Sequence, residues 1–187
     1  MLHLLSPECP DKRYRTFGAG LKAPLPAQGH GSSLQAVIVV AAPADLTSRA
    51  GEHLGWSAWH TITQAEIDHF AEGTGNRAAI HTDPAWATAH GPYGGTIAFG
   101  VQVLAMATML LSELWELRVT GGFDVGSNKV RHLNPVTAGG RVRLGAVLAA
   151  AEPVEPNGVR ATLDLTFEVE GSERPACVAQ IIFVYLF

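Results

Sequence analysis

The residues around His81 have types and a spacing that could support acid–base chemistry. The chain contains eight histidines, which as a group lack the spacing of metal ligands, so no metal site is expected. His81 differs from the others because it closes a segment containing Thr74-Gly75-Asn76 and is followed, after Thr82, by Asp83-Pro84. Imidazole exchanges protons near neutral pH, so His81 is a candidate general base. The alternative is a structural or surface histidine, with Asp83 simply capping a short helix.

Glycines follow His81 at the start of an apolar segment. Gly94, Gly95 and Gly100 precede or open this segment. Backbone N–H groups at a helix start can stabilise an oxyanion, and glycine lets a ligand approach the backbone closely. The pattern therefore favours a substrate contact near Gly95 and Gly100, although close helix–sheet packing would also require glycines.

Several spaced motifs resemble the signature of the MaoC-like dehydratases, a family of hotdog folds that includes (R)-specific enoyl-CoA hydratases and the nodulation protein N group. The resemblance covers about residues 53–187. The motifs that carry it are Phe70-Ala71, Thr74-Gly75, Ile80-His81, Asp83-Pro84, Gly95 with Ile97-Ala98 and Gly100, and the segment 126–136.

The resemblance implies addition or removal of water across the double bond of an enoyl thioester. His81 would activate the water, and the N–H of Gly100 would stabilise the enolate-like thioester oxygen. Thr108 falls where some members place a serine, so we expect it beside the substrate. Lys129 and Arg131 could meet coenzyme phosphates, or could form an ordinary solvated strand face. Coenzyme A would be part of the substrate, and no separate cofactor is expected.

The chain departs from the family pattern at several positions. The catalytic Asp of the family falls on Asn76, and an amide can orient water but cannot accept its proton. Ala78-Ala79 replaces the usual Asn-Pro, Phe99 replaces a histidine before the glycine, and the spacing from His81 to Gly100 is one residue longer than the pattern predicts.

These departures leave three functions open. The first is a hydratase or dehydratase acting on 2-enoyl or 3-hydroxyacyl thioesters, carried on coenzyme A or an acyl carrier, with the water held by His81 and Asn76. The second is a non-catalytic hotdog subunit that binds acyl thioesters or pairs with a catalytic partner. The third is hydrolysis of the thioester by an activated water on the same fold.

The hydropathy pattern predicts the helices that position these residues. Thr63 and Glu66 form a capping box, so a helix should begin at Thr63 and end at Gly73 or Gly75. The main helix is expected from about Thr96 to Leu117. It is apolar on all sides, which predicts enclosure on all sides.

Alternating and apolar segments predict an antiparallel sheet around that helix. Residues 159–169 alternate strictly between apolar and polar, and residues 142–148 do so as well. Asn157-Gly158 suits the turn between them. Two further strands are expected at 125–133 and 176–187. The sum is an α+β class protein, a single hotdog domain with a long central helix wrapped by an antiparallel sheet.

Composition excludes several classes of protein. The net charge of −4 argues against a general nucleic-acid binder. No Asp, Glu, Lys or Arg occurs from Pro84 to Ser112, but the firmly apolar part, Val101 to Leu111, is too short to span a membrane. Cys9 and Cys177 lie far apart and form no disulfide or zinc framework, which favours a cytoplasmic location.

The first 50 residues differ from the rest. Their prolines and glycines follow no period, so residues 1–50 are interpreted as a disordered or loosely packed extension, with the hotdog domain at 51–187. The apolar run from Leu34 to Ala42 faintly resembles a signal peptide, but a non-native extension or an N-terminal strand is favoured. The apolar end, Ile182 to Phe187, would leave an adhesive edge, which predicts a homodimer or a hetero-oligomer with a related subunit.

Overall fold

The computed structural model describes residues 37–187. One antiparallel sheet dominates this part of the chain, with strand order β2-β6-β7-β8-β5 and β3 also paired to β6. Its strands are β2 (His53–Trp56), β3 (His60–Thr61), β5 (Gly121–His132), β6 (Arg141–Val154), β7 (Gly158–Val169) and β8 (Cys177–Leu186). The predicted strands are therefore all present.

The alternating patterns identify the inner face of the sheet. Along β7, Val159, Ala161, Leu163, Leu165 and Phe167 are buried, and along β8 the buried residues again occur at every second position. Strand β8 lies between β7 and β5, so its apolar sequence reflects a central strand. Strand β5, not β8, is the edge strand at this end of the strand order, which corrects the expectation that the C-terminal strand itself forms the adhesive edge.

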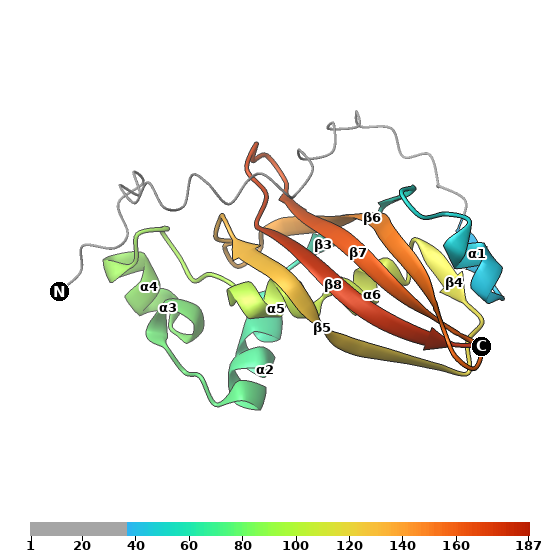
Figure 1. Ribbon diagram of the computed structural model, residues 1–187. Coiled ribbons are helices and arrows are strands. Elements are labelled where there is room, and N and C mark those ends of the chain that lie inside the picture. The colour runs from blue at the N-terminus through green and yellow to red at the C-terminus, as the bar shows by residue number, and fades with distance from the viewer. Residues whose placement is uncertain (1–36) are drawn as a thin grey trace. The chain divides into compact units, whose positions relative to one another are not determined.

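The helical segments between residues 64 and 111 lie on one face and at one end of the sheet (Figure 1). Helix α2 (Gln64–Thr74) is followed by the single turn α3 (Ala79–Thr82) and by α4 (Pro84–His90), and these three gather at one end. The predicted capping box is confirmed, with both Thr63 and Glu66 contributing, and Gly75 ends α2 in a left-handed conformation at φ 72°.

The expected helix from Thr96 to Leu117 is shorter and divided. It consists of α5 (Gly100–Ala105) and α6 (Ala107–Leu111), separated by Met106. Residues before Gly100 are extended, because the N–H of Ala98 donates to the carbonyl of Val136 at 2.8 Å. The expected enclosure of this helix on all sides is also wrong within this chain, since Val101 is 56% exposed.

A two-stranded parallel pair covers the other end of the domain. Strand β1 (Ile38–Val40) pairs with β4 (Trp115–Leu117), the segment that was expected to be the end of the helix. Helix α1 (Pro43–Thr47) follows β1 and buries Leu46 completely. Ile38–Val40 thus forms an N-terminal strand, which is one of the two interpretations given above for the run from Leu34 to Ala42. The rest of the expected extension, residues 1–36, lies outside the described residues.

Candidate active site

His81 is held in place by the short helices that follow α2. It lies in α3, and the side chain of Asp83 then accepts a hydrogen bond from the N–H of Trp86 at 2.9 Å, which caps α4. The backbone around His81 is fixed from two sides. Gln64 donates to the carbonyl of His81 at 2.8 Å, and the N–H of Ile97 donates to the carbonyl of Ile80 at 3.1 Å.

The imidazole of His81 has one engaged nitrogen and one free nitrogen. Its Nδ1 lies 2.7 Å from the carbonyl oxygen of Ile97. A carbonyl can only accept, so Nδ1 carries the proton in this bond, and the neutral ring leaves the Nε2 lone pair available. The arrangement is that of a base whose tautomer is selected by the backbone.

An aromatic wall supports the ring of His81. The ring stacks on Phe99 with centroids 3.8 Å apart and an interplanar angle of 25°, and Phe99 contacts Phe70 at 5.2 Å. Phe99 is only 5% exposed. The residue that replaces the histidine of the family pattern therefore forms an apolar support for His81 and orients its ring.

His81 and Gly100 line the same pocket, which has a volume of about 280 Å³. Gly100 is the first residue of α5, and its N–H has no acceptor among the described residues. The prediction that these two residues share a site is supported by this placement. The other lining residues are Tyr93, Ile97, Ala98, Val103, His132, Leu133, Asn134, Pro135, Val136 and Ala176.

Asn76 does not line this pocket. It is exposed between α2 and α3, where its Oδ1 accepts a hydrogen bond from the N–H of Ala78 at 3.2 Å. The carbonyl oxygen of the amide thus organises the start of the α3 turn. Sharing of one water between Asn76 and His81 is not supported by this geometry.

The other predicted site residues lie elsewhere. Gly95 is half-buried in the loop before α5 and lines neither of the two pockets described here. Lys129 and Arg131 are exposed on β5 opposite Gln180 and Val178. The alternating residues of β8, including Cys177, are buried, so both basic side chains occupy the outer face, away from Gly100. The solvated-face interpretation of this pair is therefore favoured.

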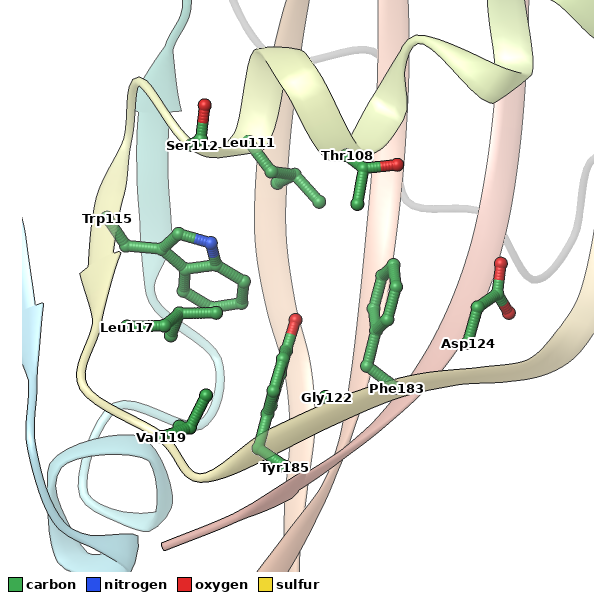
Figure 2. Close-up of a pocket in the computed structure, with 10 residues that line it drawn as sticks. All are labelled: Thr108, Leu111, Ser112, Trp115, Leu117, Val119, Gly122, Asp124, Phe183 and Tyr185. Carbon is green, nitrogen blue, oxygen red and sulfur yellow. The ribbon is translucent and has the colours of Figure 1, made fainter.

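Thr108 lines a second pocket, of about 440 Å³ (Figure 2). The rings of Trp115 and Tyr185 meet edge to face at 5.8 Å, and Phe183 stacks on Tyr185 at 5.7 Å. Burial and the nearby charge of Asp124 raise the pKa of Tyr185, so its phenol stays neutral. The remaining lining residues are Leu111, Ser112, Leu117, Val119 and Gly122.

His132 is the site residue that sequence reasoning missed. Its ring lies directly over Gly100, where a Cβ atom would be 2.7 Å from Cγ of His132. The available signal was its position inside the segment 126–136 that carries the family resemblance. Its place beside Gly100, however, depends on the pairing of β5 with β8.

The described residues contain neither a candidate metal-ion cluster nor a candidate membrane-spanning helix. Among residues 37–187, no cluster of three or more His, Cys, Asp and Glu could hold a metal ion. No helix in the same range is long and apolar enough to cross a membrane.

Comparison with known proteins identifies the family. The MaoC like domain matches residues 45–169. The chain is 44% identical to 3-hydroxyacyl-thioester dehydratase Z of Mycobacterium tuberculosis, over 76% of this chain and 95% of that protein. It is 37% identical to nodulation protein N of Rhizobium leguminosarum bv. viciae, over 77% of this chain and 91% of that protein.

Solved structures show the same fold. The MaoC-like dehydratase from Rhodospirillum rubrum has a TM-score of 0.59 and 22% identity, covering 73% of this chain and 92% of that one. The (R)-hydratase from A. caviae has a TM-score of 0.59 and 20% identity, covering 72% and 94%. The described part of the chain is thus a hotdog domain. The protein belongs to the MaoC-like dehydratase family.

Proposed function

We propose that this protein catalyses the reversible hydration of 2-enoyl thioesters to 3-hydroxyacyl thioesters. The observation that carries the proposal is the fixed tautomer of His81, which leaves a basic Nε2 in a pocket that also contains the free N–H of Gly100. Hydration of an enoyl thioester requires a base for the water and a donor for the oxygen that becomes negative. The names of the 3-hydroxyacyl-thioester dehydratase and of the (R)-hydratase indicate the same reaction class.

The two pockets suggest how an acyl thioester would lie. Gly100 and Val103 line the first pocket, and Thr108 and Leu111 line the second, so their spacing follows one stripe of the α5–α6 segment. Gly100 and Thr108 are eight positions apart along α5 and α6, which corresponds to about 12 Å at the rise of a helix. The thioester would lie beside Gly100, and the acyl chain would extend toward the apolar, aromatic pocket beside Thr108.

The open edge of β5 supports a homodimer as part of this proposal. Phe123 and Val125 are 55% and 52% exposed on β5, and the main chain of this edge strand has no partner strand on its outer side. Natural proteins seldom leave such an edge uncovered.

The proposal requires no separate cofactor, because coenzyme A is part of the substrate. A cytoplasmic location stays a prediction.

The presence of Asn76 favours one competing function, a non-catalytic subunit that pairs with an active relative. A structural neighbour with a TM-score of 0.54 comes from the ChsH1-ChsH2 complex of Mycobacterium tuberculosis, which has two different components. Fifteen per cent identity supports only the fold in that comparison.

One experiment separates these functions. Purified protein is incubated with a series of 2-enoyl-CoA thioesters, and loss of the conjugated double bond, formation of 3-hydroxyacyl product and release of free thiol are recorded. Hydration by the pure homo-oligomer supports the proposal. Release of thiol without hydration would establish a thioesterase, and no turnover would favour the non-catalytic subunit.

A further inference from the structure

Two imidazoles from distant parts of the sequence line the pocket that contains Gly100. His81 comes from α3, and His132 comes from the last position of β5. No Asp or Glu is among the described residues that line this pocket, and the only other titratable side chain is that of Tyr93. The family pattern predicts a carboxylate at residue 76. This residue is an asparagine instead, and its side chain does not line the pocket.

We propose that His132 is a second catalytic acid–base residue, which exchanges a proton with the acyl thioester while His81 acts on water. This inference rests on the proposed hydratase function.

The packing of His132 places it where the thioester would bind. His132 pairs with Cys177 across the sheet, and Cys177 is fully buried, so His132 belongs to the inner face of β5. A Cβ atom at Gly100 would lie 2.7 Å from Cγ and 2.8 Å from Nδ1 of His132. The ring thus sits directly beside the backbone whose N–H would receive the thioester oxygen.

The two imidazoles differ in a way that suits two roles. The Nδ1 atom of His81 is engaged by the carbonyl of Ile97, which leaves a single nitrogen for a base. The ring of His132 makes no hydrogen bond or ion pair with the described residues, and it is exposed. A ring in this position can take up a proton from solvent and present it to a bound substrate.

The proposed reaction adds one water across the C2–C3 double bond of the enoyl thioester. Nε2 of His81 removes one proton from water while the water oxygen bonds to C3. The π electrons of the C2–C3 bond move into the thioester, and Gly100 N–H donates to the resulting enolate oxygen. The enolate electron pair then forms the C2–H bond with a proton from the imidazolium of His132. His81 returns one proton to solvent and His132 regains one, so the net addition is one water.

The test compares two substitutions at one site. His132→Phe keeps a ring over Gly100 but removes both hydrogen bonding and proton transfer, whereas His132→Gln keeps hydrogen bonding without proton transfer. For both variants we expect kcat for enoyl-CoA hydration to fall on the order of 10²–10⁴-fold. The Kd for a saturated thioester, hexanoyl-CoA, should stay within about threefold, because binding of the ground state is not altered. His90→Phe is the matched control, since His90 is exposed, stacks on Trp86 and lines neither pocket.

Two results from the His132 variants would overturn the inference. A rate retained within about threefold in either His132 variant would show that proton transfer by this ring is not used. A parallel loss of hexanoyl-CoA binding would assign His132 a structural role and would also overturn it. If the wild type is active and His132→Phe is too, only this inference fails. If the wild type hydrates no enoyl thioester, the proposed function fails and the inference fails with it.

Discussion

The Nδ1 atom of His81 donates a hydrogen bond to the carbonyl oxygen of Ile97 at 2.7 Å, which fixes the tautomer of the ring. The same backbone segment leads to Gly100, so the contact also ties the base to the proposed oxyanion donor. Ile97 pairs in turn with Thr137 in an isolated bridge, which joins this segment to the loop between β5 and β6. The base and the N–H donor are therefore positioned by one short extended segment.

The fit of His132 over Gly100 predicts that Gly100→Ala impairs activity more than stability. The added Cβ would lie 2.7 Å from Cγ of His132, so that ring must move. Because the ring is exposed, it can move outward, and we expect a loss of unfolding free energy of about 1 kcal/mol, at the low end for overpacking. Hydration should fall at least about tenfold, since the ring and the N–H no longer share the site. Urea unfolding and kcat/KM measure the two effects, and an unchanged kcat/KM would contradict this geometry.

The placement of Asn76 outside the pocket predicts a small effect of Asn76→Asp. Aspartate can accept the same hydrogen bond from the N–H of Ala78, so the turn should be kept. Hydration rates should change by less than about threefold, because the new carboxylate lies away from the reacting atoms. Kinetics with the same enoyl thioester test this expectation. A gain of a hundredfold or more would place residue 76 at the reaction centre, contrary to the structure.

Burial of Cys177 predicts a poorly reactive thiol and a pH-dependent stability. Desolvation raises the pKa of Cys177 from about 9 to about 11. The native state keeps the thiol protonated, so its contribution to stability is complete below pH 9 and is lost as the pH rises through 11.

Alkylation of a Cys9→Ser variant reports on Cys177 alone. At pH 8 the thiolate fraction of the native thiol should be about a hundredfold below that of the unfolded chain, and alkylation should be slower by at least that factor. Equal rates for native and urea-unfolded protein would show that Cys177 is accessible and its pKa unshifted.

The exposed apolar residues of β5 predict that Val125→Lys prevents dimerisation. Val125 is 52% exposed, so the substitution should change stability by less than about 0.5 kcal/mol, whereas lysine on an edge strand opposes pairing. Val39→Lys is the matched control, because Val39 is 44% exposed on β1, a strand that does not pair with β5. Sedimentation velocity should show a dimer for the wild type and the control and a monomer for Val125→Lys. A monomeric wild type, or a dimeric Val125→Lys, would contradict the assignment of this edge.

Features encoded by nearby residues could be predicted from the sequence. The strict alternation in 159–169 determines a strand with one buried face, and Thr63 with Glu66 determines a helix start, because each depends only on neighbours in the chain. His81 was found in the same way, from a local motif. The N-cap at Asp83 also needs nothing beyond the next turn.

Features that depend on distant pairing could not be predicted. Trp115–Leu117 falls within the helix expected at 96–117, but it forms β4, paired with Ile38–Val40. The position of His132 over Gly100 requires the register of His132 with Cys177, which no local pattern specifies. The same register places Lys129 and Arg131 on the outer face of β5 and His132 on its inner face.

The most direct test of the account is the hydration rate of His81→Asn. The amide of asparagine can still donate to the carbonyl of Ile97, so this variant keeps the structural contact and loses the basic Nε2. With a 2-enoyl-CoA thioester we predict turnover by the wild type and a kcat/KM lower on the order of 10²–10⁴-fold in the variant, at equal thermal stability. Full activity of His81→Asn would contradict the assignment of His81 as the base that activates water.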